Sequence, residues 1–69
     1  MDVVAITELR ARYAQAIRSA ETYRDQAETI APLREFYQAL AMTYERSARE
    51  MRLMLDTVER IERDRDIAA

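Results

Sequence analysis

The side chains with the strongest chemistry in this sequence are eleven arginines, thirteen acidic residues and four tyrosines, because the chain has no histidine and no cysteine. A carboxylate serves as a general acid or base when burial or a close partner shifts its pKa. Here the Asp and Glu residues fall on the polar side of the expected helices. The inward Glu-x-x-His pairs of di-iron bundles require histidine. We therefore expect no enzyme and no catalytic, cofactor-binding or metal site.

Four acidic residues each stand four positions before an arginine, which gives the pairs Glu8 with Arg12, Glu45 with Arg49, Asp56 with Arg60, and Glu59 with Arg63. On a helix this order favours surface ion pairs worth about 0.2–0.5 kcal/mol each. Local helix stabilisation is the favoured interpretation of these charges over a recognition site.

Arginines also gather toward one side of the second half of the chain. They form a candidate anion-binding strip of Arg46, Arg49, Arg52, Arg60 and Arg63. Acidic residues are interleaved with this strip, and the net charge of −2 argues against a general polyanion binder. The four tyrosines could stack on nucleobases, but their heptad positions favour a place in the core.

Two apolar stripes with heptad spacing predict two long helices, about 3–30 and 32–65. The first stripe contains Ile6, Leu9, Tyr13, Ala16, Ala20, Tyr23, Ala27 and Ile30. The second contains Leu33, Tyr37, Leu40, Tyr44, Ser47, Met51, Met54, Val58 and Ile61. The chain has no glycine, which agrees with an all-α protein. Residues 62–69 form a charged end that we expect to fray.

The single proline separates the two stripes and predicts a reversal of the chain. Pro32 disfavours helical angles at Ala31 and suits the first turn of a new helix. Asp2 is the expected N-cap of the first helix. A hairpin would set Ala27 against Tyr37, Tyr23 against Leu40 and Ala20 against Tyr44, so that a large residue meets a small one at each layer. One continuous kinked helix is the alternative, and the hairpin is favoured.

Two helices alone cannot enclose both stripes, and further apolar residues widen their faces. These residues are the candidate interface: Ile17, Phe36, Ala41, Met42, Ala48 and Leu55. A widened apolar face is what a bundle core requires. A chain of 69 residues without disulfides also needs additional stabilisation. We therefore expect a single domain that dimerises as a four-helix bundle, with a tetramer left open.

Part of the second stripe resembles short, uncharacterised bacterial proteins with two helices. The similar residues are Pro32-Leu33-Arg34, Leu40-Ala41, Tyr44-Glu45-Arg46 and Ala48-Arg49. The pattern in those proteins is P-x-x-R followed by L-A-x-x-Y-E-x-x-A, with Arg34 here one residue closer to the proline. The resemblance covers about the middle third of the chain. It implies a helical hairpin of bacterial, cytoplasmic origin and no known function.

Three functions fit these features to different degrees. A self-associating interaction module, serving as an adaptor, inhibitor or assembly factor for another protein, is favoured by the surplus apolar surface. An RNA-binding bundle of the Rop type is the alternative, and it depends on the arginines and on fold analogy alone. Binding to a membrane surface ranks last because the polar face is mixed in sign. No apolar run is long enough to span a bilayer, so we expect a cytoplasmic protein.

Overall fold

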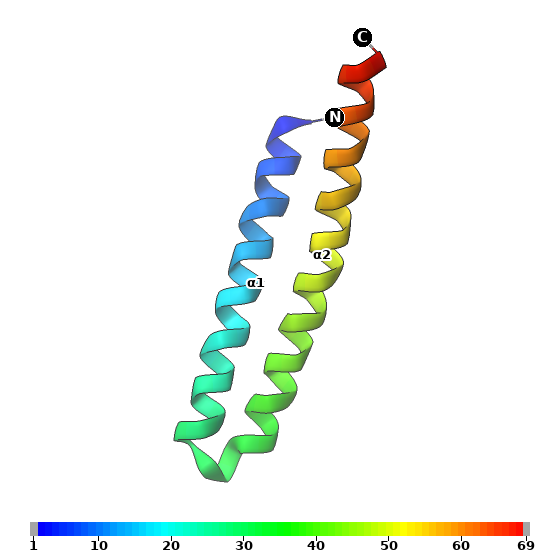
Figure 1. The fold of residues 1–69 in the computed structure, drawn as a ribbon. Helices are drawn as coiled ribbons and strands as arrows, with labels where there is room; N and C mark the ends of the chain where they lie inside the picture. Colours follow the sequence, from blue (N-terminus) through cyan, green and yellow to red (C-terminus); the bar gives the residue numbers. More distant parts are fainter. Residues whose placement is uncertain (1, 69) are drawn as a thin grey trace.

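The computed structural model describes residues 2–68 as two antiparallel helices joined by a tight turn (Figure 1). Helix α1 spans Val3–Thr29, and helix α2 spans Arg34–Ala68. Between them one 3-10 turn, η1, spans Ala31–Leu33. The all-α hairpin is therefore confirmed, and the alternative of one continuous kinked helix is wrong.

Asp2 caps the start of α1, as its residue type predicts. Its backbone is extended, with φ −70° and ψ 118°, and its side-chain oxygen accepts a hydrogen bond from the amide of Val4 at 3.0 Å. The first amides of a helix have no partner inside the helix. The Asp2 carboxylate satisfies one of them, so the helix begins at Val3.

The turn begins at Ile30, where the backbone leaves helical angles with φ −110° and ψ 75°. The Ile30 amide still donates to the Gln26 carbonyl at 2.8 Å, and the Leu33 amide donates to the Ile30 carbonyl at 3.0 Å. Pro32 lies in the first turn of η1, where its missing N–H costs no helical hydrogen bond. Ile30, expected in the apolar stripe, is therefore part of the exposed turn.

Small residues dominate the surface where the two helices meet, which we call the seam. Its buried members are Ile6, Ala16, Ala20 and Ala27 from α1, and Ala41, Ala48 and Leu55 from α2. Alanine allows helix backbones to approach closely, because its side chain is a single methyl group. The first stripe thus faces α2 as predicted, apart from Ile30.

The second stripe is only half correct. Tyr37, Tyr44, Met51 and Val58 are half-buried along the seam, as expected. Of the positions predicted to alternate with them, Leu40, Ser47 and Met54 each stand one residue before a buried position, and Leu33 and Ile61 are exposed. One residue is about 100° of helical rotation. This row is therefore turned to the flank of α2, and the smaller residues Ala41 and Ala48 take its place in the seam.

Three tyrosine rings stack across the turn-proximal half of the hairpin. The centroid of the Tyr23 ring lies 5.5 Å from that of Tyr44 and 6.0 Å from that of Tyr37, with nearly parallel planes. The expected contact of Tyr23 with Leu40 assumed that large residues avoid each other. Stacking overturns that assumption, because offset parallel rings attract one another.

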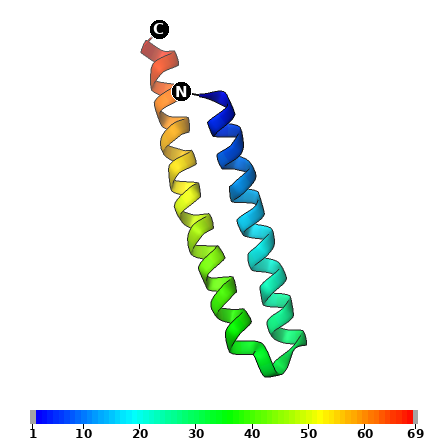
Figure 2. The same ribbon diagram turned by 180° about the vertical axis from the view of Figure 1, so that it is seen from behind.

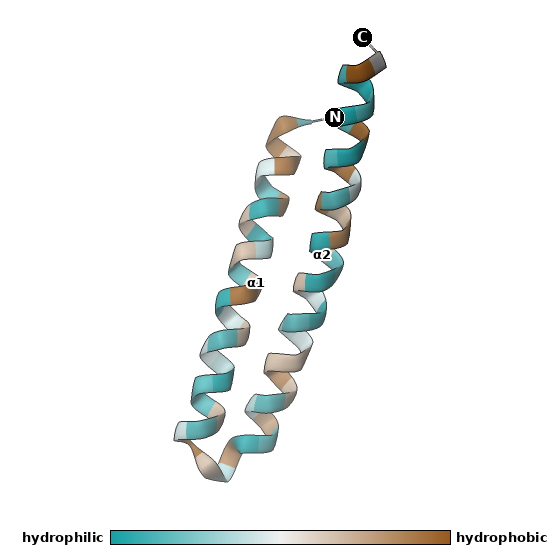
Figure 3. Cartoon of the chain, viewed as in Figure 1, coloured by the Kyte–Doolittle hydropathy of each residue, from teal (hydrophilic) through white to brown (hydrophobic). Residues whose placement is uncertain are grey.

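The hairpin is long and thin, with extents of 57 × 17 × 11 Å. Figures 1 and 2 show the last turns of α2 extending past the start of α1, which the sequence predicts from the unequal helix lengths. The segment expected to fray is helical through Ala68, and residue 69 lies outside the described residues. Polar and apolar residues alternate along both helices (Figure 3), and within residues 2–68 neither helix is long and apolar enough to cross a membrane.

Candidate functional site

The six residues of the candidate interface fall into two groups. Ala41, Ala48 and Leu55 are buried between α1 and α2, with Leu55 only 2% exposed. Their assignment as surface for a partner is therefore wrong, because the hairpin itself covers them. Phe36 and Met42 are exposed and Ile17 is half-buried, so these three are accessible to a partner.

A different set of residues, from the end of η1 and from α2, provides the apolar surface that the buried ones do not. We call it the outer row, and it consists of Leu33, Leu40, Ser47, Met54 and Ile61. Leu33, Met54 and Ile61 are exposed by 42% or more, and Leu40 and Ser47 are half-buried. The sequence singled out these residues correctly as one apolar face. The sequence analysis placed that face against α1, whereas in the structure it lies on the flank of α2.

The candidate anion strip is exposed but partly neutralised. The Arg52 guanidinium lies 2.8 Å from the Asp56 carboxylate and 4.0 Å from that of Glu59. Asp56 and Glu59 were expected to pair with Arg60 and Arg63 instead. Glu8 and Arg12 do form the expected pair, at 2.5 Å. The strip therefore carries less free positive charge than its arginines suggest, and RNA binding stays a prediction.

The best-defined polar contact joins the two helices between Arg24 and Glu45. The guanidinium donates two hydrogen bonds to the carboxylate, from Nε to Oε1 and from Nη2 to Oε2, the second at 2.8 Å. Such a bidentate pair fixes geometry better than a single contact does. The expected pairing of Glu45 with Arg49 is therefore wrong, because Glu45 points to α1.

This contact also shifts the pKa values of both partners. The hydrogen bond from Arg24 lowers the pKa of Glu45, with smaller effects of burial, which raises it, and of the Arg24 and Arg49 charges, which lower it. The same hydrogen bond raises the pKa of Arg24. Both groups are thus held in their charged forms, which suits a structural ion pair and not proton transfer near neutral pH.

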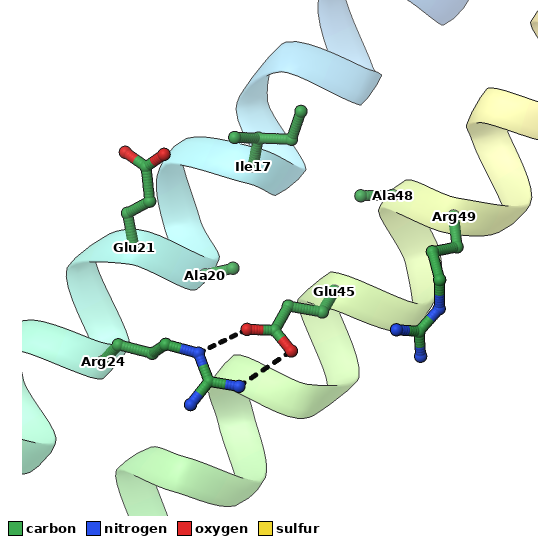
Figure 4. A pocket seen from close by; sticks show the side chains of 7 residues that line it. All are labelled: Ile17, Ala20, Glu21, Arg24, Glu45, Ala48 and Arg49. Carbon is green, nitrogen blue, oxygen red and sulfur yellow. Dashed lines mark hydrogen bonds and ion pairs between the residues drawn. The ribbon is translucent and has the colours of Figure 1, made fainter.

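A shallow groove of about 350 Å³ lies beside this ion pair (Figure 4). The methyl groups of Ala20 and Ala48 form its floor, while Glu21 points away from α2 and the Arg49 guanidinium extends beyond Glu45. Ile17 lines one end. The groove is open and contains no unpaired buried polar atom, since every buried side-chain N and O within residues 2–68 has a hydrogen-bond partner.

Acidic ligand clusters and buried polar residues are both absent from the described part of the chain. Within residues 2–68 no three acidic side chains come together in a way that could hold a metal ion. All of the buried residues that the structure describes are hydrophobic. The accessible features of the described residues include an apolar row, a charged strip and several open grooves.

Sequence reasoning missed the Arg24–Glu45 ion pair and the tyrosine stack, both of which join residues far apart in the chain. One signal was present, since both ionic partners stand next to the seam positions Tyr23 and Tyr44. Charged residues in such flanking positions often pair between helices. Choosing the partner required the register of the hairpin.

No protein-family model matches this chain, and no curated protein or solved structure shows significant similarity to it. The suspected resemblance to bacterial two-helix proteins therefore stays a prediction.

Proposed function

We propose that this chain is a non-catalytic helical interaction module that self-associates through the outer row of α2. The observation that carries the proposal is the exposure of large apolar side chains in one row along a single helix flank. Leu33, Met54 and Ile61 are 48%, 53% and 42% exposed. Scattered apolar residues are normal on a surface, but several large ones aligned along one flank indicate a place for a partner.

The surface area supports the same proposal. The chain exposes 5401 Å², whereas a compact folded protein of its 8.1 kDa mass exposes about 4,500 Å². The surplus is about 900 Å², close to the roughly 800 Å² that each partner buries in a standard interface. Its radius of gyration, 16.2 Å, likewise exceeds the roughly 11 Å of a compact chain of this length. A second copy would cover this surplus.

Self-association of this kind would produce a four-helix bundle with charged outer faces. Met42 lies outside the outer row and is 57% exposed, so it stays accessible in such a bundle. A flexible, polarizable methionine suits an adaptable contact. Another protein would meet this remaining surface, in keeping with a role as adaptor, inhibitor or assembly factor.

Light scattering across a hundredfold dilution, with circular dichroism on the same samples, tests the proposal. We expect a helical dimer at high concentration. Met54→Glu should give a helical monomer, because it places a charge in the outer row. Met42→Glu is the matched control, since Met42 is 57% exposed and lies on another side of α2. A wild-type chain that stays monomeric and helical at every concentration would refute self-association.

A further inference from the structure

We infer that two copies of this chain dock antiparallel along α2, with a two-fold axis that passes beside Ser47 of both copies. This inference rests on the proposed self-association. It adds the face, the direction and the register of the contact, which the proposed function leaves open. The partner is a second copy of the same chain.

The outer row is symmetric about its middle residue. Leu40 and Met54 each stand seven residues from Ser47, and Leu33 and Ile61 each stand fourteen residues away. In an antiparallel pair related by a two-fold axis beside Ser47, each residue meets the one equally distant on the other side. Leu40 then meets Met54 of the partner subunit, and Leu33 meets Ile61 of the partner subunit. Every large member of the row gains an apolar neighbour.

Side-chain size suits the same axis. Ser47 is the smallest member of the row, and it lies where the axis brings identical residues together. A small residue at that point allows the two α2 helices to approach closely, and the flanking Leu and Met side chains fill the space on either side. Two-fold interfaces are self-complementary in this sense, since one patch serves both copies.

Charge selects the antiparallel direction over the parallel one. Arg46 and Glu50 lie on the same outer edge of the row, one residue before and three residues after Ser47. The two-fold axis brings each Arg46 within side-chain reach of Glu50 in the other copy, which gives two symmetric ion pairs. In a parallel two-fold pair this edge of one copy lies on the opposite side of the interface from the same edge of the other copy, so the two Arg46–Glu50 ion pairs would not form.

Both charged groups are available for this contact. The ion pairs that form within residues 2–68 use Glu8, Arg12, Arg24, Glu45, Arg52, Asp56 and Glu59. Neither Arg46 nor Glu50 is among them, and both side chains are exposed. No tertiary contact of the single chain therefore has to break when the second copy binds.

Disulfide capture tests the face of the contact, because the natural chain has no cysteine. Under mild oxidation Ser47→Cys should form a covalent dimer in high yield. Met42→Cys is the control, since Met42 is exposed but lies on another side of α2. Equal yields for the two variants would overturn the assigned face.

A mixture of two variants tests the direction. Leu40→Cys and Met54→Cys are mixed as reduced proteins, allowed to exchange subunits and then oxidised. Intact-mass spectrometry separates the mixed disulfide from the two symmetric ones, because the chains differ in mass. The antiparallel register predicts mainly the mixed product. Mainly symmetric products would overturn the direction.

Charge exchange tests the edge of the contact. Arg46→Glu should raise the dissociation constant of the dimer by about 2- to 30-fold, because two exposed ion pairs are lost and acidic residues are brought together. The double variant Arg46→Glu with Glu50→Arg should regain most of the dimer affinity, because the exchanged charges can pair again. The control is Arg49→Glu combined with Glu50→Arg, which should not regain the affinity that Glu50→Arg removes. Failure of the double variant to recover would overturn the Arg46–Glu50 pairing.

These experiments separate two kinds of failure. If light scattering shows only monomer, the proposed self-association fails and this inference fails with it. If light scattering shows a dimer while the disulfide products are wrong, self-association stands and only the assigned geometry is overturned.

Discussion

Two rows of residues run along α2 with the same seven-residue period, and their fates differ. The inner row of Ala41, Ala48 and Leu55 is buried against α1, whereas the outer row, one residue earlier in each repeat, lies on the flank. Apart from Ser47, the outer row consists of large apolar side chains, whereas two of the three inner-row residues are alanine. Burial in this hairpin therefore follows how closely the helices can pack and not hydrophobicity alone.

The alanines explain this preference. Ala41 has no exposed surface, and the facing helix contributes Ala16, Ala20 and Ala27 to the same seam. Two alanine-rich faces can approach to the short end of the usual helix-packing distances. Close approach increases the number of favourable contacts between the two backbones. The bulkier outer row is then left for a second interface.

The largest expected effect comes from truncating Leu55, the one large side chain that is fully buried within the described residues. Leu55→Ala should lower the free energy of unfolding by about 2–5 kcal/mol, because it removes apolar contacts and leaves a cavity. Met54→Ala changes the neighbouring residue of the outer row and should cost less than about 1 kcal/mol in the monomer. Urea denaturation at low protein concentration measures both.

The same pair of variants should respond differently to concentration. The free energy of unfolding of a dimerising protein rises with its concentration. This rise should be smaller for Met54→Ala than for the wild type, and unchanged for Leu55→Ala. If the two variants lost the same free energy of unfolding at low protein concentration, the division into inner and outer rows would be contradicted.

An intermediate effect is expected from enlarging the inner row. Ala41→Leu should destabilise the hairpin by about 1–3 kcal/mol, because the seam has no room for the added carbons. Ala39→Leu is the control on the same helix, and as an exposed position it should change stability by no more than about 0.5 kcal/mol. Thermal unfolding followed by circular dichroism compares them. A stable Ala41→Leu variant would mean that the helices are not closely packed at that layer.

The smallest effect concerns the polar flank and its dependence on pH. Because Arg24 lowers the pKa of Glu45 in the folded chain, the ionised pair stabilises the fold above the unfolded-state pKa of Glu45. That contribution is lost as the pH falls through the lowered folded-state value. Glu45→Gln should therefore unfold at a slightly lower temperature than the wild type at neutral pH, with the difference closing in acid.

Glu21→Gln is the matched control for this measurement. Glu21 lines the same groove without an ion pair to Arg24. The difference in unfolding temperature between Glu21→Gln and the wild type should therefore not change as the pH falls. A Glu45→Gln variant whose unfolding temperature tracks the wild type at every pH would show that the ion pair adds nothing to stability, as is found for many exposed pairs.

Local features were predictable because they depend on residues close together in the chain. Asp2 caps α1 through the nearby amide of Val4, and Pro32 sets the turn within a few residues of its expected place. The first stripe was also predictable, because only one row of α1 is continuously apolar. The pairing of Glu45 was not, since Arg49 in the next turn and Arg24 on the other helix were both suitable partners.

The sequence by itself determined two long helices, a reversal near Pro32 and the face that α1 presents to α2. The tertiary structure alone decided which row of α2 is buried, which arginine binds Glu45 and that the tyrosines stack. The physical reason lies in the helical repeat. Each of the two rows alternates with Tyr37, Tyr44, Met51 and Val58, and the rows differ from each other by one residue, so both satisfy the heptad period. The distance to which two alanine-rich helices can approach then selects between them.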